Sequence, residues 1–273
     1  MKIISWNIAH RSQLWWKLLD ADADIALLQE ACEPPSELAV RFDIDDAPWR
    51  TAGAGLKRHW RTVVVGLNPR IRLHRVATLP LAEAGPGDFA VSRPGTLAVA
   101  EAENLDTGER VTVISMYAPW DRTHASTNSR WIFADASVHR LISDISVLIG
   151  SQNGHRIVAA GDLNILYGYG ENASSYWAER YRVIFERFSA VGLEFVGPQY
   201  PFGRQADPWP EELPLASLNV PTFYTSRQSP ATATRQLDFV FASVCIAGRV
   251  KTMALNKVEE WGDSDHCKID IEL

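Results

Sequence analysis

The sequence predicts an α/β fold in which two β-sheets pack face to face and helices cover their outer sides. Short apolar runs of strand length mix irregularly with amphipathic segments of helical spacing, whereas a doubly wound parallel sheet would show strict alternation. Hydrophobic residues make up 46% of the 273 residues, which is ample material for a large core. Packing two sheets buries their apolar faces and brings strand ends to a common rim, where sites are usually built.

Nothing in the sequence divides the chain, so we expect one domain over residues 1–273. The chain enters its first strand too early for a signal peptide, and no apolar run approaches the roughly 20 residues of a membrane span. Three cysteines without paired spacing suit a reducing compartment (Cys32, Cys245 and Cys267). We therefore expect a cytoplasmic protein that does not bind membranes, and we presume a monomer.

The N-terminal elements follow from apolar periodicity. Lys2–Ile8 is rich in Ile and Trp and alternates loosely, which predicts a strand. Gln13–Ala21 has its apolar residues at helical spacing, and Asp24–Gln29 has the length of a short buried strand. Two hairpins are expected next, each around a turn sequence: Trp60–Leu67 with Ile71–Thr78, and Thr96–Glu103 with Arg110–Tyr117.

The C-terminal half contains two expected helices. Ser129–Ile149 carries one apolar face, and Ser175–Val191 is closed by Gly192, which suits a left-handed cap. Arg156–Ala160 lies between them as a buried strand, and a long loop rich in Pro and aromatic residues spans Pro198–Pro221. The closing strands are expected at Thr222–Thr225, Leu237–Ser243, Val250–Asn256 and Cys267–Glu272.

Polar residues stand where the apolar strands end, and they suit phosphoryl-transfer chemistry. A phosphate is anionic, so hydrolysis needs a cation that reduces repulsion and stabilises developing charge. Magnesium prefers oxygen ligands and keeps several waters, so one or two carboxylates suffice. Glu30 and Asp265 are the natural carboxylate pair, and Asn7 offers an amide oxygen.

A second group of residues suits activation of water. Asp162 is the candidate to take a proton, and Asn164 shares its strand face two residues on. His266 is placed to stabilise transition-state oxygens, and Asp238 is the candidate that charges and orients it. Alone, each motif is more often a turn, strand end or cap. The weight comes from all of them occurring in order, each at the end of an apolar run.

The complete set resembles the ordered motifs of the endonuclease/exonuclease/phosphatase superfamily. The resemblance spans residues 3–272 and rests on Trp6-Asn7, Leu28-Gln29-Glu30, Ser115-Met116-Tyr117-Ala118-Pro119, Gly161-Asp162-Leu163-Asn164, Leu237-Asp238-Phe239-Val240 and Ser264-Asp265-His266. It implies a four-layer α/β sandwich and dependence on Mg²⁺, for which Mn²⁺ can substitute. It also implies the roles argued above for each residue, and it adds a phosphate contact from Tyr117.

The sequence departs from the AP endonucleases of that superfamily at two places. They carry a second Asn followed by Gly after the first Asn, whereas this chain has Ile8-Ala9-His10; and Trp120 stands where they usually carry Asn. These differences argue against dedicated repair of abasic sites without touching the metal centre. His10 and Arg11 are candidates for additional phosphate contacts, although a helix N-terminal turn is the more common role for such a pair.

The most consistent function is a metal-dependent nuclease acting on DNA or RNA. Trp120 and Trp261 are candidates to stack on bases, with packing of a loop as the alternative for Trp261. A basic stretch between Arg50 and Arg75 lines either a phosphate cleft or solvated strands. The net charge of −6 favours the alternative of a phosphoesterase for a small molecule or lipid headgroup. A binding module without catalysis is a third hypothesis, which the full set of catalytic residue types disfavours.

Overall fold

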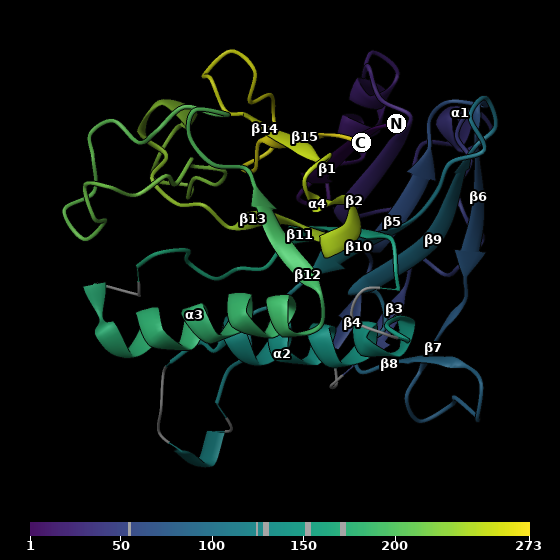
Figure 1. Cartoon of the computed structure of the whole chain (residues 1–273), viewed down its shortest axis with the longest axis horizontal. Coiled ribbons are helices and arrows are strands. Elements are labelled where there is room, and N and C mark those ends of the chain that lie inside the picture. Colours follow the sequence, from purple (N-terminus) through teal and green to yellow (C-terminus); the bar gives the residue numbers. More distant parts are fainter. Residues whose placement is uncertain (54–55, 124, 128–130, 151–153, 170–172) are drawn as a thin grey trace.

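Two mixed β-sheets lie face to face at the centre of the structure (Figure 1). The computed structural model describes residues 1–53, 56–123, 125–127, 131–150, 154–169 and 173–273. One sheet contains, in spatial order, β14 (Lys251–Leu255), β15 (Lys268–Glu272), β1 (Lys2–Asn7), β2 (Ile25–Ala31) and β5 (Arg61–Gly66). The other contains β12 (Leu193–Gly197), β13 (Asp238–Ser243), β11 (Ile157–Asp162), β10 (Arg110–Tyr117), β9 (Leu97–Asn104) and β6 (Ile71–Val76).

The alternation of side chains along β11 shows how the sheets share their core. Val158 and Ala160 point into the cluster that fills the space between the two sheets. Ile157 and Ala159 point the opposite way, into a second cluster beneath the helices. Because the strand is buried on both faces, its sequence is an unbroken apolar run.

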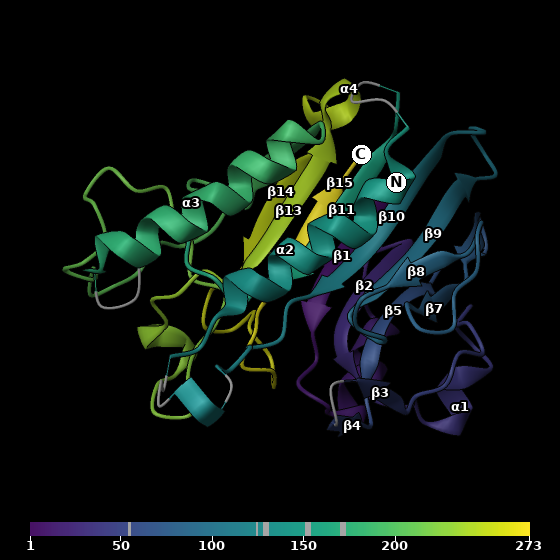
Figure 2. The ribbon, with the colours of Figure 1, turned by 90° about the horizontal axis from the view of Figure 1, so that it is seen from below.

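Two helices cover the outer face of the six-stranded sheet. They are α2 (Ala134–Ile145) and α3 (Ser175–Ala190), which lie side by side over its strands (Figure 2). Phe188 of α3 stacks on Phe241 of β13 with ring centroids 3.9 Å apart. Both side chains are fully buried, so this contact fixes α3 against the sheet.

The outer face of the five-stranded sheet carries a thinner layer. The 3₁₀ helix η1 (Ser12–Leu18) and the short helix α1 (Ser36–Ala39) lie over it. Trp15 from η1 and Leu38 from α1 are fully buried in the cluster that they form with that sheet. The layers are therefore helix, sheet, sheet and helix, which confirms the predicted α/β sandwich.

Smaller elements complete the fold. Two short pairs of strands are β3 (Thr51–Gly53) with β4 (Leu56–Arg58), and β7 (Thr78–Pro80) with β8 (Phe89–Val91). The remaining helical turns are η2 (Ala125–Thr127), η3 (Ser146–Leu148), η5 (Pro230–Thr232) and α4 (Val244–Ala247). Within the described residues, no helix has both the length and the apolar character needed to cross a membrane.

The first predicted hairpin is wrong. β5 pairs with β2 in the five-stranded sheet, whereas β6 pairs with β9 in the six-stranded sheet. The segment between them crosses from one sheet to the other, and the backbone N–H groups of Leu67 and Asn68 both donate to the carbonyl of Asp24. An Asn-Pro turn is compatible with both a hairpin and a crossing, so the turn sequence did not distinguish them.

Other boundaries also differ from the prediction. The expected helix at Gln13–Ala21 is a 3₁₀ helix that ends at Leu18. The helix expected at Ser129–Ile149 begins at Ala134, and residues 129 and 130 lie outside the described residues. Thr222–Thr225 forms no strand, and only Phe223 makes isolated bridges, to Arg235 and to His266.

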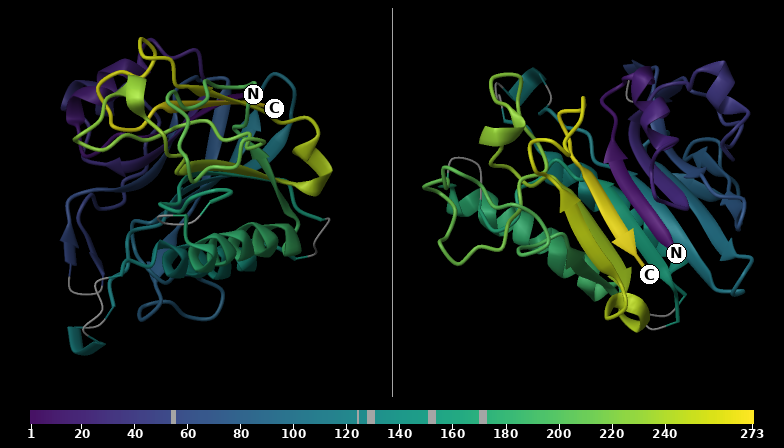
Figure 3. Two further views of the ribbon diagram at one scale, coloured as in Figure 1. Left: turned by 90° about the vertical axis from the view of Figure 1, so that its left-hand side faces the viewer. Right: turned by 90° about the horizontal axis from the view of Figure 1, so that it is seen from above.

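The two ends of the chain lie side by side (Figure 3). β15 pairs antiparallel with β1, and the amino group of Met1 donates to the carbonyl of Leu273 over 2.8 Å. This pairing carries the residues that precede β15 to the same rim as the residues at the end of β1.

Candidate active site

Strand register places three of the predicted catalytic residues in one row. Tyr117 at the end of β10 is paired with Asp162 at the end of β11. Asp162 is in turn paired with Asp238 at the start of β13. Because β11 runs parallel to β10 and antiparallel to β13, strand ends and a strand start meet at the same rim.

Gly161 is required for this arrangement. Gly161 has a φ of +156°, and its backbone lies very close to β10. A Cβ at this position would lie 1.9 Å from the carbonyl oxygen of Met116. Any side chain would push β11 away from β10 and move Asp162 with it. The glycine before Asp162 is therefore part of how the site is built.

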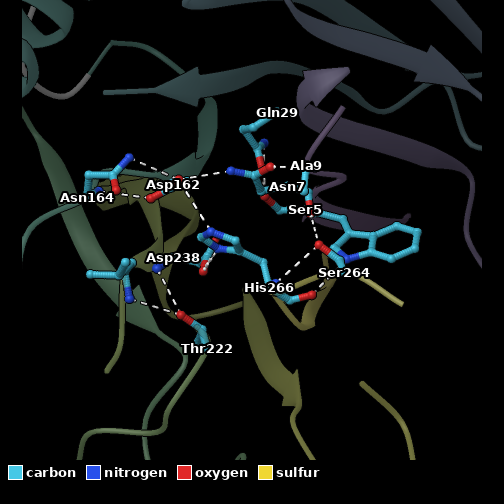
Figure 4. Close-up of polar contacts among 12 residues, drawn as sticks. Ser5, Asn7, Ala9, Gln29, Asp162, Asn164, Thr222, Asp238, Ser264 and His266 are labelled. Atoms are coloured by element: carbon cyan, nitrogen blue, oxygen red, sulfur yellow. Dashed lines mark hydrogen bonds and ion pairs between the residues drawn. The ribbon is translucent and has the colours of Figure 1, made fainter. Parts of the chain in front are cut away.

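Asp162, His266 and Asp238 form the buried centre of the site (Figure 4). The Nδ1–H of His266 donates to Asp238 Oδ2 over 2.8 Å. Its Nε2 lies 3.7 Å from Asp162 Oδ2, which is too long for a good hydrogen bond. At most 4% of any of the three residues is exposed, so the charges act on each other with little screening by water.

The electrostatics of this trio follow from burial and from the neighbouring charges. Burial opposes the charged imidazole, but the carboxylates of Asp238 and Asp162 outweigh it and raise the pKa of His266 to about 10. Burial raises the pKa of Asp162 to about 8 against the attraction of His266, and Asp238 and Glu30 push it in the same direction. His266 is therefore a cation at neutral pH, whereas Asp162 readily accepts a proton.

Two asparagines hold the Asp162 carboxylate. Asn7 donates its Nδ2–H to Asp162 Oδ2 over 3.0 Å, and its own Oδ1 accepts the N–H of Ala9. The backbone N–H of Asn164 donates to Asp162 Oδ1 over 2.9 Å, and its side chain donates to Oδ2 over 3.1 Å (Figure 4). One of these partners is 155 residues away in the sequence and the other only two, so the carboxylate is held both by its own loop and by β1.

Backbone contacts fix the loop that carries His266. Ser264 donates its hydroxyl to the carbonyl of Asn7 over 2.7 Å and accepts the N–H of His266 over 3.1 Å. The indole N–H of Trp6 donates to the carbonyl of His266. Thr222 Oγ1 accepts the backbone N–H of Asp238 over 3.1 Å. Both partners of the imidazole–carboxylate bond are therefore anchored independently.

Glu30 stands apart from this trio at an irregularity in β2. The register between β2 and β5 shifts between Leu28 and Ala31, and Glu30 has a positive φ of 48°. Its carboxylate binds His10 Nε2 over 2.9 Å and accepts a hydrogen bond from the Tyr117 hydroxyl. Burial acts to raise the pKa of Glu30, but these two partners outweigh it and lower the pKa, so the carboxylate is charged.

Backbone strain concentrates around these residues. Among the described residues, five non-glycine residues have positive φ, and four of them lie at this site: Ala9, His10, Glu30 and Asn164. Such conformations cost on the order of 1–3 kcal/mol each and persist where surrounding contacts impose them. A rim with this much strain is typical of a functional site.

The predicted metal ligands offer oxygen donors suited to a hard divalent cation. Asp265 Oδ1 is buried and has no hydrogen-bond partner among the described residues. Such an atom costs about 1–3 kcal/mol unless something binds it, which a cation would do. Glu30 is charged, and Asn7 adds an amide oxygen. These residues fit Mg²⁺ or Mn²⁺.

The buried trio itself is a poorer metal site. Ligand atoms of Asp162, Asp238 and His266 lie within 4.8 Å of one another, a spacing that a cation would accept. A metal requires neutral imidazole, however, and the raised pKa of His266 keeps both ring nitrogens protonated. The trio therefore suits proton transfer and charge stabilisation.

The aromatic candidates differ in position. Trp261 is fully buried and packs on Tyr224 with ring centroids 5.5 Å apart, so the expectation that it stacks on a base is corrected: it packs the loop before Asp265. Trp120 is 54% exposed and reachable from solvent. Arg11 lies at the start of η1, where its side chain makes no hydrogen bond or ion pair with any described residue.

Two aromatic residues that the sequence did not single out border the site, Trp60 and Phe223. Trp60 stacks on His10 at 5.1 Å and meets Tyr117 edge-on at 5.0 Å. Arg58 lies over the Trp60 ring at 4.9 Å, and Phe223 packs on His266 with centroids 4.9 Å apart. Neither aromatic residue belongs to a motif, because each borders the site through a tertiary contact.

Most of the basic stretch is neutralised within the fold. Arg61 pairs with Asp45, Arg70 with Asp24, and Arg75 with Asp43. These partners all precede Arg50 in the sequence. Arg58, whose side chain lies over the Trp60 ring, is the member of the basic stretch found beside the site.

Comparison with known proteins identifies the fold. No protein-family model and no curated protein sequence matches the chain. Its structure is similar to the catalytic domain of Xenopus laevis APE2, with a TM-score of 0.62, 19% identity, and coverage of 100% of this chain and 91% of that one. It also matches an endonuclease/exonuclease/phosphatase from Bacteroides vulgatus, with a TM-score of 0.57, 15% identity, and coverage of 100% and 98%.

The chain has the endonuclease/exonuclease/phosphatase fold. The likeness extends to a mannosyl-6-phosphatase of Bacteroides thetaiotaomicron, with a TM-score of 0.54, 12% identity, and coverage of 100% of this chain and 98% of that one. Proteins with this fold thus differ in substrate. At such identities the endonuclease/exonuclease/phosphatase fold alone does not select one of them.

Proposed function

We propose that the protein is a Mg²⁺- or Mn²⁺-dependent phosphodiesterase that hydrolyses DNA or RNA. The observation that carries the proposal is the buried row in which Asp238 binds a charged His266 beside Asp162. A proton acceptor next to a fixed cation is what water attack on an anionic phosphate needs.

In the proposed reaction, Asp162 takes a proton from a water molecule while the water oxygen attacks phosphorus. The bond from phosphorus to the leaving oxygen breaks, and that oxygen takes a proton from solvent water, which yields a phosphomonoester and an alcohol. Asn7 and Asn164 hold the Asp162 carboxylate in one orientation, so the proton acceptor is fixed before the substrate binds. In its charged form, which a bound cation would favour, its raised pKa makes it a stronger base than an ordinary carboxylate.

His266 stabilises the negative charge that develops on the phosphoryl oxygens. Its Nδ1–H is committed to Asp238, whereas its Nε2–H has no close acceptor at 3.7 Å from Asp162 and is available to the substrate. Tyr117 and Asn164 contact the phosphate from the neighbouring strand ends. Burial raises the pKa of Tyr117 well above its usual range, as does the nearby Glu30 carboxylate, so its hydroxyl remains a donor.

Glu30, Asp265 and Asn7 would hold the cation. When bound, it supplies positive charge that offsets repulsion between the phosphate and the attacking water and that favours the charged form of Asp162. The unpartnered oxygen of Asp265 supports this assignment.

The proposal is tested by cleavage of labelled single-stranded, duplex and abasic DNA, and of RNA, with Mg²⁺, Mn²⁺ or chelator. Asp162→Asn should lower the rate by about 10²–10⁴-fold, because it removes the proton acceptor and keeps the shape. Asp270→Asn is the matched control, since Asp270 is a half-buried acid on β15 whose pKa burial also raises. Failure of the wild type to cleave any nucleic acid would contradict a nuclease.

A second candidate is a phosphoesterase for a small molecule or lipid headgroup. The net charge of −6 favours it, because a long nucleic-acid footprint needs a basic surface. Most arginines of the basic stretch are already paired with acids, which points the same way. Salt distinguishes the two: affinity for an extended nucleic acid falls steeply with salt, whereas affinity for a small phosphoester changes little.

A further inference from the structure

A cavity of about 300 Å³ opens beside the catalytic row, on the side toward α3. Such a volume is at the lower end of the about 300–1,000 Å³ of small-molecule sites. Its walls are mainly apolar, and five of the twelve lining residues are aromatic. These five are Trp120, Trp131, Trp177, Tyr181 and Phe223, and Arg235 is the one charged residue among the twelve.

The cavity is continuous with the reacting centre. Asn164 lines it and also binds both oxygens of Asp162. Phe223 forms another part of its wall, with its ring packed on that of His266 at 4.9 Å. The cavity therefore lies within reach of a group next to a phosphate bound between His266 and Asp162.

The walls are suited to a flat ring. Trp177 is buried at the base, and Trp131 lies against it with ring centroids 5.6 Å apart. Trp120 is more than half exposed and stands at the mouth. Indole faces bind planar π-systems by stacking, whereas they leave the hydroxyls of a sugar without partners.

Arg235 adds hydrogen-bond donors to this apolar lining. Its backbone carbonyl accepts the N–H groups of Thr222 and Phe223, which fixes its position at the wall. Within the described part of the chain its guanidinium has no carboxylate or hydrogen-bond partner, although the residue is half-buried. Ring nitrogens and exocyclic oxygens of a base are suitable acceptors for it, and an alkyl chain offers none.

We propose that this cavity binds the nucleobase of the nucleotide whose phosphate is hydrolysed. The inference rests on the proposed nuclease function and narrows its substrate to nucleotides that carry an intact base. It follows that abasic positions are poor substrates, because they leave the aromatic cavity unfilled. Stacking on an aromatic side chain strengthens binding by about 5- to 150-fold, the equivalent of about 1–3 kcal/mol per base.

Binding is measured first, because it does not depend on turnover. Calorimetric titration of the full chain with Mg²⁺ compares three probes: adenosine 5′-monophosphate, ribose 5-phosphate and hexyl phosphate. The nucleotide should bind at least 5-fold more tightly than either other probe. Equal affinity for nucleotide and ribose 5-phosphate would overturn the proposal, and tighter binding of hexyl phosphate would show a cavity for alkyl groups.

Substitutions connect that preference to the cavity. Trp120→Ala should reduce the preference for the nucleotide over ribose 5-phosphate by about 5-fold or more, and Trp120→Phe should restore most of it because a ring is present again. Trp16→Ala is the matched control, since Trp16 is a similarly exposed tryptophan on η1 over the other sheet. An unchanged preference in Trp120→Ala contradicts the assignment.

Cleavage distinguishes failure of this inference from failure of the proposed function. The substrate is an oligonucleotide with one internal base replaced by hydrogen, compared with the intact oligonucleotide at the same phosphate. Slower cleavage beside the missing base supports the cavity as a base site. Equal cleavage refutes the base site and leaves the nuclease intact, whereas nucleotide binding without any cleavage refutes the nuclease and retains the base site.

Discussion

Replacing Asp238 by Asn removes one charge from the buried row and leaves its shape unchanged. The carboxylate oxygen lies 2.8 Å from His266 Nδ1, and that of Asp162 lies 3.7 Å from Nε2. At an effective dielectric constant of about 20, these separations correspond to attractions of up to ~6 and ~4.5 kcal/mol. The rise in the pKa of His266 from 6.5 to about 10 corresponds to ~5 kcal/mol, so burial offsets about half of the combined attraction.

Loss of the attraction between Asp238 and His266 therefore removes the whole rise in the pKa of His266. In Asp238→Asn we expect His266 to titrate below about pH 7, whereas in the wild type it stays charged to about pH 10. The Asn side-chain oxygen still accepts the Nδ1–H, and the Asp238 backbone N–H still donates to Thr222, so the fold should persist. Hydrolysis at pH 8 should fall by about 10- to 100-fold, because the imidazole is then neutral.

The assay is ¹H–¹⁵N correlation of the histidine ring nitrogens between pH 5 and 10, in chelator. Asp270→Asn serves as the control because it removes a carboxylate from β15 far from the imidazole. If His266 in Asp238→Asn still carries its charge at pH 9, Asp238 is not what holds that charge, and the electrostatic reasoning for the site is wrong.

Three further predictions concern metal binding and stability. Asp265→Asn should weaken Mn²⁺ binding, measured by calorimetry, at least about tenfold. The urea midpoint should not fall, because the buried Oδ1 of Asp265 has no protein partner to lose among the described residues. Unchanged Mn²⁺ affinity would remove Asp265 from the metal site. Asp24→Asn should lower the free energy of unfolding by about 1–3 kcal/mol, since it weakens the pair between the buried Asp24 and the half-exposed Arg70. Burial opposes the charge on Asp24, but Arg70 outweighs burial and lowers the pKa of Asp24. Wild-type stability should therefore fall as the pH drops from the ordinary range of an Asp pKa through this lowered pKa. Urea denaturation across that pH range should show a shallower fall in Asp24→Asn. Phe188→Ala should cost about 3–5 kcal/mol in urea denaturation by opening a cavity under Phe241, and a smaller loss would show that α3 repacks.

The strands and the polar residues at their ends were predictable because both are local. A buried strand such as β11 is an apolar run, and the carboxylate that ends it is visible in the sequence. Strand register then places Tyr117, Asp162 and Asp238 side by side, because the three strands end or begin at the same rim.

What could not be predicted depends on tertiary contacts. The assignment of β5 and β6 to different sheets is decided by partners β2 and β9, far away in the chain. Trp261 is buried because Tyr224 and the sheet core enclose it, which no local pattern reveals. The aromatic cavity is assembled from segments between Trp120 and Leu237, so only folding makes it visible.

The pairing of β1 with β15 determines when the site can exist. β15 lies between β14 and β1 in the sheet, so the earliest strand to be synthesised waits for one of the last. Asn7 and Glu30 are made before the other site residues, and Asp265 and His266 after them. A chain that stops before Ser264 therefore lacks both β15 and the imidazole of His266, so neither the complete five-stranded sheet nor the proposed site can form.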